Sequence, residues 1–163
     1  MSDDKIKSPS FSLLKSGNQS LDIEKDFALV FTATIFVDNI ARAYISDKNI
    51  REEQYLTSLN YYLSNHPRIK KMIFIENSGV SLAPFQQLFE KNNPHNKQVE
   101  FISLNTNLSY SHKGKGFGEC LLIEQGLKKS KLINSVTHFG KITGRLCLLN
   151  LTEILESLKK LEY

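Results

Sequence analysis

The stretch FALVFTATIFV, residues 27–37, decides the fold. It is a continuous apolar run rich in aromatic and β-branched side chains, which is typical of a strand buried on both faces of a parallel sheet. Shorter runs of similar character, MIFI at residues 72–75 and VEFISL at 99–104, predict two further strands. A fourth strand region is expected over residues 136–149, bent at Gly140 and Gly144.

Helical patterns separate these strands. Helices are expected over residues 51–64, after a capping Ser81, over residues 117–129 with Cys120 on the apolar side, and after Asn150. Alternating strands and helices predict an α/β fold, a three-layer sandwich with a mostly parallel sheet and right-handed crossovers. In such a sheet the segments 34–39, 76–79 and 105–118 follow the strands, and they should converge on one ligand-binding crevice.

Length and composition limit the alternatives. A chain of 163 residues suits one domain, which we expect over residues 27–163 behind a flexible arm of residues 1–26. Its 40% hydrophobic and 23% charged residues exclude a disordered chain, a collagen and a coiled coil. Two cysteines, Cys120 and Cys147, are too few for a disulfide framework, and both are predicted to lie in the core.

The chain shows no secretory signal pattern and no apolar run long enough to span a membrane. The predicted location is therefore the cytoplasm, either free or at the inner face of the membrane. A net charge of +4 favours anionic partners such as phosphates, nucleic acid or an acidic membrane surface. Nucleic acid is not expected, because apart from Phe117 and Phe139 the basic clusters lack interleaved aromatic residues.

The strongest local motif is KGKGFGE at residues 113–119, where a loop leads into a helix. Glycines let backbone N–H groups approach a phosphate, and Lys113 and Lys115 add charge to the positive end of the helix. The spacing matches neither a dinucleotide fingerprint nor a P-loop, and a flexible turn with solvated lysines would use the same residues. Glu119 suits the first helical turn for dipole reasons alone.

Two further clusters follow predicted strands. Glu76 and Asn77, in the sequence ENSG, can hydrogen-bond a base or a ribose, although a turn needs the same residues, and Asp38 and Asn39 are equally ambiguous. The sequence KITGR at residues 141–145 places two cations and a hydroxyl in a region that otherwise resembles a buried strand, which favours anion binding. His138 is either a general base or a hydrogen-bonded structural residue.

The element order and these three motifs resemble the nucleotide-sugar-binding half of GT-A type glycosyltransferases, in particular glycosyltransferase-like proteins of bacterial surface-polysaccharide biosynthesis. The resemblance covers roughly residues 27–155 and implies a truncated GT-A or Rossmann-like fold. It also implies that Glu76 or Asn77 contacts the nucleobase or ribose, and that Lys113, Lys115 and Gly116 lie near the ribose and diphosphate.

The sequence departs from that family in two respects. Where the family has an Asp-x-Asp metal motif, this chain has residues 141–145 without an acidic pair, so no metal or other cofactor is predicted. Lys141 and Arg145, with the hydroxyl of Thr143 between them, are expected to supply the positive charge instead. Members of that family usually continue with strands and helices that hold the acceptor, so we expect a minimal enzyme, a truncated relative, or a subunit whose acceptor side comes from a partner subunit or from the second copy in a homodimer.

Two functions remain open at this stage. One is a glycosyltransferase-like protein that binds a nucleotide sugar and a glycan or lipid-linked acceptor in lipopolysaccharide or capsule assembly. The other is a non-catalytic nucleotide-binding or protein-interaction module derived from such an enzyme. Fold alone does not decide between them.

Overall fold

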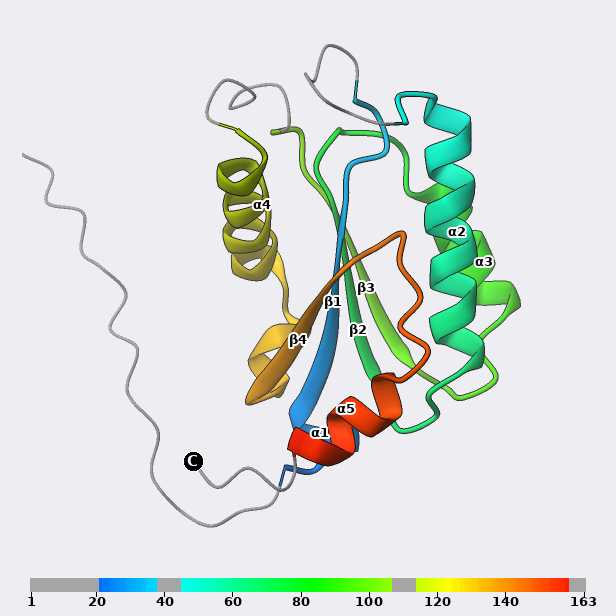
Figure 1. Ribbon diagram of the computed structural model, residues 1–163, viewed down its shortest axis with the longest axis vertical. Coiled ribbons are helices and arrows are strands. Elements are labelled where there is room, and N and C mark those ends of the chain that lie inside the picture. The colour runs from blue at the N-terminus through cyan, green and yellow to red at the C-terminus, as the bar shows by residue number, and fades with distance from the viewer. Residues whose placement is uncertain (1–20, 38–44, 107–113, 159–163) are drawn as a thin grey trace, which may run out of the picture.

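A computed structural model describes residues 21–37, 45–106 and 114–158 (Figure 1). Along the chain the elements are α1 (Ile23–Asp26), β1 (Phe27–Ala33), α2 (Lys48–Ser64), β2 (Lys71–Glu76), α3 (Ala83–Lys91), β3 (Gln98–Ser103), α4 (Lys115–Lys129), the 3₁₀ helix η2 (Leu132–Ser135), β4 (His138–Thr143) and α5 (Leu151–Leu158). The predicted arm thus ends in α1, where Ile23 is buried.

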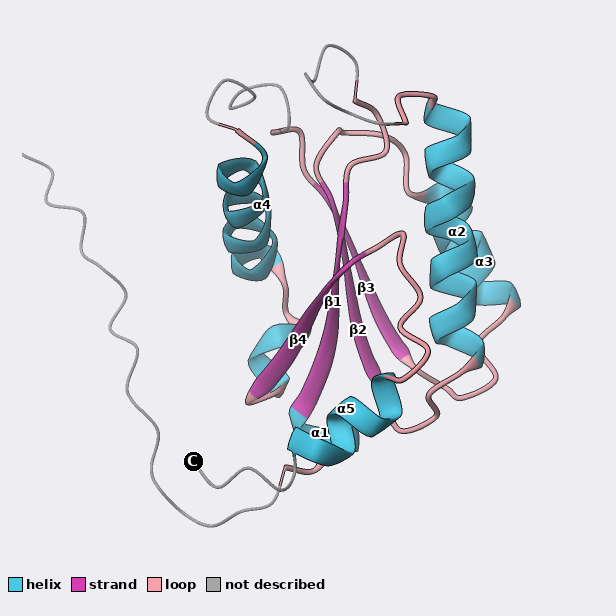
Figure 2. Ribbon diagram, in the orientation of Figure 1, coloured by secondary structure: helices cyan, strands magenta, loops and turns pink. Residues whose placement is uncertain are grey.

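The four strands of the described residues form one all-parallel sheet in the order β3-β2-β1-β4. The central strand β1 is buried along its whole length, which explains why all its residues except Thr32 are apolar. Helices α2 and α3 lie on one side of the sheet and α4 lies on the other (Figure 2). The predicted α/β three-layer sandwich is therefore confirmed, and the architecture is Rossmann-like.

Alternation along β1 divides the core into two layers, because successive side chains of a strand point to opposite faces. Leu29 and Phe31 pack with α2 and α3 through residues such as Phe85, whereas Ala28 and Val30 face α4. On the first face the rings of Phe31 and Phe74 stack with centroids 6.2 Å apart. This face is sealed at the amino end of the sheet by α5, through its buried Leu151 and Leu155.

The predicted strand over residues 136–149 is too long. Pairing with β1 ends where the Gly144 N–H donates to the Thr32 carbonyl at 2.9 Å, and the Leu146 N–H then closes a turn on Thr143. The following loop runs along α2, where the Ser58 and Tyr62 hydroxyls donate to the Leu146 carbonyl. This loop is therefore apolar because it packs against α2 and is partly exposed there, and not because it forms a strand.

The prediction that both cysteines lie in the core is wrong, since Cys120 and Cys147 are exposed. Cys147 lies in the loop after β4. In α4 the buried positions are Leu122 and Gly126, which are four residues apart on the face turned to the sheet. A side chain at Gly126 would collide with Ile75. The glycine therefore allows α4 to pack closely against β2 with this face turned to the sheet.

No helix within the described ranges is long and apolar enough to cross a membrane.

Candidate functional site

The predicted crevice residues lie at the carboxyl ends of the strands. The chain passes from β1 outward to β2 and β3 and then returns to β4 on the other side of β1, so the order reverses between β1 and β4. Ligands of open parallel sheets bind at such a point. The loops after β2 and β3 meet here through a bridge between Ser78 and Asn105.

Glu76, at the end of β2, is fully buried and ties two loops together. Its Oε1 accepts hydrogen bonds from the N–H groups of Ile35 (3.2 Å) and Ser78 (2.8 Å) and from the Ser78 hydroxyl. Burial raises the pKa of this carboxyl, although these hydrogen bonds act in the opposite direction. Its Oε2 is buried and has no partner among the described residues. A base or ribose would reach Glu76 only if this oxygen became exposed.

Asn77 belongs to the same rim of the crevice. Its Oδ1 accepts from the Thr34 hydroxyl at 2.7 Å, and its N–H donates to the Ala33 carbonyl at 3.1 Å. The Thr106 N–H donates to the Asn77 carbonyl at 2.9 Å. Asn77 thus connects the loops after β1 and β3, so the structure gives both predicted base-contacting residues a part in shaping the rim.

The KGKGFGE motif opens α4 as predicted. Gly114 is the N-cap with φ 89°, a backbone conformation that favours glycine, and no side chain caps the helix. A Cβ placed at Gly114, Gly116 or Gly118 would meet nothing within 4 Å. Among the described residues, therefore, no side chain caps the start of the helix or lies close to these glycines. Lys113 and the side chain of Lys115, like Asp38 and Asn39, lie outside the described residues.

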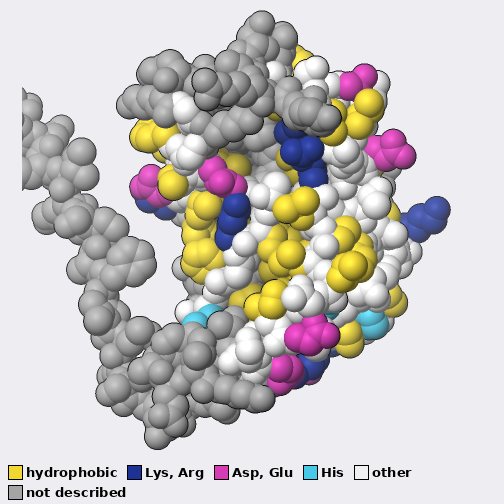
Figure 3. All heavy atoms as spheres, viewed as in Figure 1, with side chains coloured by type: hydrophobic (Ala, Val, Ile, Leu, Met, Phe, Trp, Pro, Cys, Tyr) yellow, Lys and Arg dark blue, Asp and Glu magenta, His cyan; other side chains and the backbone are white. Residues whose placement is uncertain are grey.

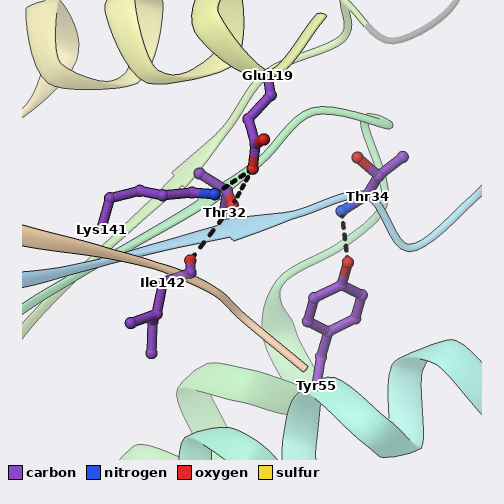
Figure 4. A network of polar contacts seen from close by, with 6 residues as sticks. All are labelled: Thr32, Thr34, Tyr55, Glu119, Lys141 and Ile142. Carbon is purple, nitrogen blue, oxygen red and sulfur yellow. Dashed lines mark hydrogen bonds and ion pairs between the residues drawn. The ribbon is translucent and has the colours of Figure 1, made fainter. Parts of the chain in front are cut away.

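Lys141 and Glu119 form an ion pair between β4 and the first turns of α4 (Figure 4). The Thr32 hydroxyl lies 3.3 Å from both Glu119 Oε1 and the Ile142 carbonyl oxygen, so it extends the pair to the central strand. The Lys141 and Glu119 side chains are 28% and 44% exposed. The positive charge of Lys141 is consequently compensated within the protein.

Arg145 lies on the other side of the sheet, although only three residues separate it from Lys141. Its Nη1 donates to Gln54 Oε1 of α2 at 3.0 Å, and its Cζ lies 5.9 Å from the Tyr55 ring centroid. Figure 4 shows Tyr55 and Lys141 on opposite sides of β1. The last predicted residue, Thr143, ends β4 between the two cations and is half-buried.

Two residues of this edge, Arg51 and Tyr55, were not predicted from the sequence. Arg51 is 6% exposed; its Nε and Nη2 donate to the Thr34 carbonyl and its Nη1 to the Ile45 carbonyl. Burial, and next to it repulsion from Arg145, lowers the pKa of the Arg51 guanidinium. The Tyr55 hydroxyl accepts from the Thr34 N–H at 3.0 Å. One available signal was an arginine in the first turn of a helix, where the dipole disfavours a cation.

His138 lies at the amino end of β4, away from the crevice, with its Nδ1 2.8 Å from the Thr137 hydroxyl.

Among the residues that the structure describes, no three His, Cys, Asp or Glu side chains are grouped so that they could hold a metal ion. The described residues of this edge supply hydrogen-bonding groups and positive charge. In comparisons with known proteins, no family model matches the chain, and no curated protein or solved structure shows significant similarity to it.

Proposed function

We propose that this domain binds a nucleotide sugar at the carboxyl edge of its sheet and acts as a glycosyltransferase-like protein in the assembly of a surface glycan. One observation supports this most: Arg145 and the glycine-rich start of α4 lie at the end of the sheet where the strand order reverses, and among the described residues neither has a carboxylate partner or a side-chain cap. Phosphate groups need positive charge and N–H donors, and this edge offers both.

The charges suggest how a diphosphate would be accommodated without a metal ion. In glycosyl transfer the bond between the anomeric carbon and a phosphate oxygen breaks, and the oxygen of an acceptor hydroxyl bonds to that carbon and gives its proton to water or to the departing diphosphate. Negative charge develops on the departing diphosphate. Positive groups that are fixed before the reaction stabilise that charge most. Among the described groups, Arg51 is fixed in this way, and Arg145 and the N–H groups that open α4 are suited to contact the phosphate oxygens.

A panel of ligands tests the proposal. The full chain is mixed with UDP, GDP, CMP, ADP and their common sugar conjugates, each in EDTA and in Mg²⁺, and the melting temperature is measured. A ligand at 100 times its Kd stabilises the native state by about 2.7 kcal/mol. For a chain of this size that corresponds to a rise of roughly 5–10 °C.

We expect one nucleotide class to produce this rise in EDTA. The control is Lys128→Gln, which removes a cation from the far end of α4 that pairs with Glu124 and should leave the rise intact. Absence of any rise would contradict the proposal. A rise that requires Mg²⁺ would contradict the part of it in which protein cations replace the metal.

The second candidate is a non-catalytic interaction module, and a specific surface favours it. Phe139, Leu146 and Leu149 are 46%, 57% and 81% exposed on β4 and the loop that follows it. Figure 3 shows hydrophobic side chains scattered over the middle of this face, with few charges among them. A nucleotide that binds without any release of its sugar, in the presence of candidate acceptors, would favour this candidate.

A further inference from the structure

Two guanidinium groups lie against one tyrosine ring at the reversal point. Arg51 and Arg145 each have Cζ 5.9 Å from the centroid of Tyr55. Within the described part of the chain, no carboxylate forms an ion pair with either arginine. Burial lowers the pKa of Arg51, and repulsion from the adjacent cation Arg145 lowers it further. A bound anion would relieve this repulsion.

The two arginines differ in their freedom to contact a ligand. All three guanidinium nitrogens of Arg51 donate to backbone carbonyls, so Arg51 is fixed beside the loop after β1. Arginine keeps its proton at any physiological pH, even when its pKa is lowered. Arg51 therefore provides a stationary positive charge and is not itself free to turn toward a ligand.

Arg145, by contrast, is incompletely satisfied. Its one hydrogen bond among the described residues goes to the neutral amide of Gln54. Its Nε is buried and has no acceptor there. A buried donor without a partner is destabilising, so a small movement of the guanidinium toward an oxyanion would gain hydrogen bonds and lose little. The planar guanidinium can meet two oxygens of one phosphate at once.

Lys141 lacks these features. Its ammonium is already paired with Glu119 on the α4 side of the sheet, and the pair is joined to β1 through Thr32. A phosphate at Lys141 would have to compete with that carboxylate. The two cations of the KITGR motif, which the sequence assigns to one task, are thus placed in different electrostatic settings.

We propose that Arg145, beside the fixed charge of Arg51, is the phosphate-binding residue of this edge, and that Lys141 instead holds α4 against the sheet. The anion is a phosphate or diphosphate group. Its source as part of a nucleotide rests on the function proposed above, whereas the anion subsite can be tested separately. Inorganic pyrophosphate supplies the anion alone, nucleoside diphosphates add the nucleoside, and unphosphorylated nucleosides lack the anion.

The experiment measures Kd by isothermal titration calorimetry on the full chain in low salt and EDTA. The probes are pyrophosphate, the nucleoside diphosphates UDP, GDP and ADP, and the corresponding nucleosides. The variants are Arg145→Gln, Arg145→Lys and Lys141→Gln, with Lys128→Gln as a matched loss of one positive charge remote from the site. The melting temperature of each ligand-free variant is recorded, and Arg145→Lys, which keeps the charge, serves if Arg145→Gln proves unstable.

We expect Arg145→Gln to weaken pyrophosphate and nucleoside diphosphate binding at least tenfold. Arg145→Lys should weaken it at least threefold, because it keeps the charge but loses the planar pair of donors. Lys141→Gln and Lys128→Gln should each change Kd less than threefold.

Other outcomes overturn specific parts. Undiminished nucleoside diphosphate binding in both Arg145 variants, or an equal loss in Lys141→Gln, overturns the assignment to Arg145 while nucleotide binding stands. A third outcome is that pyrophosphate binds, that Arg145→Gln abolishes this binding, and that nucleoside diphosphates bind no more tightly than pyrophosphate. This result upholds the anion subsite and contradicts a nucleotide as the ligand. No binding of any probe by the unaltered chain overturns both.

Discussion

Glu76 connects two loops by hydrogen bonds, but its buried carboxyl group destabilises the fold when it is ionised. It is a carboxyl group with no solvent exposure, and burial raises its pKa despite three hydrogen bonds to Oε1. A raised acid pKa means that the folded state holds the proton to higher pH than the unfolded state does. Stability therefore falls as pH rises from the unfolded pKa, near 4.3, through the raised folded value.

Replacing Glu76 with Gln should remove this pH dependence. The amide oxygen can still accept from Ile35 and Ser78, but the side chain no longer ionises. We expect the free energy of unfolding of Glu76→Gln, relative to the unaltered chain, to increase between pH 4.5 and pH 8. Urea unfolding at a series of pH values measures it, with the exposed Glu90→Gln as control. If the difference in free energy of unfolding between the two proteins stayed constant with pH, ionisation of Glu76 would not destabilise the folded state.

At the scale of elements, α4 depends on a glycine for its place on the sheet. A Cβ at Gly126 would lie 2.4 Å from Ile75 Cδ1 and 2.6 Å from its Cγ2, and Ile75 is fully buried in β2. A Cβ at Gly118, in the same helix, meets nothing within 4 Å. An alanine at Gly126 therefore tests both packing and helix propensity, whereas an alanine at Gly118 tests helix propensity alone.

Gly126→Ala should lower the free energy of unfolding by about 1–3 kcal/mol, because the close-packed interface must open. Gly118→Ala should raise it by about 0.5–1 kcal/mol through helix propensity. Urea unfolding of both variants at pH 7 gives the comparison. If Gly126→Ala were as stable as Gly118→Ala, the approach of α4 to β2 described above would be wrong.

The sequence predicted the order and type of the major elements, because their signals are local. The largely apolar stretch at residues 27–37 contains β1, and the leucine spacing over 51–64 falls within α2, which begins three residues earlier at Lys48. The end of β4 was missed because Leu146 and Leu148 are as apolar as a strand would be. Only the contacts of that loop with Ser58 and Tyr62 of α2 show why they leave the sheet.

The site was predictable in place but not in its pairings. Parallel topology alone brings Glu76, Asn77, the start of α4 and the end of β4 to one edge. The sequence could not show that the ion pair of Lys141 crosses to Glu119, or that Arg145 turns to Gln54 of α2. These two contacts depend on the face of the sheet toward which each side chain points. The register of β4 on β1 and the turn at Gly144 determine that face.

The whole molecule has two dissimilar ends. At the carboxyl end of the sheet lie the open start of α4 and the arginines beside Tyr55. At the amino end lies Lys97, 3% exposed, whose ammonium donates to the carbonyls of Asn65 and His66 at 2.8 and 2.9 Å. Burial, with repulsion from Lys70, lowers the pKa of Lys97 to about 8. Two of the three ammonium donors already have backbone acceptors, and we expect the anion at the carboxyl end.

The most direct test is a backbone amide NMR titration of the full chain with a nucleoside diphosphate in EDTA. We predict the largest shift changes at Thr34, in the loop after Glu76, over residues 116–119, and at Gly144 and Arg145. Amides near Asn65 and Lys97, at the amino end, should stay in place. Changes concentrated at that end, or no changes at saturating ligand, would contradict a ligand site at the carboxyl edge of the sheet.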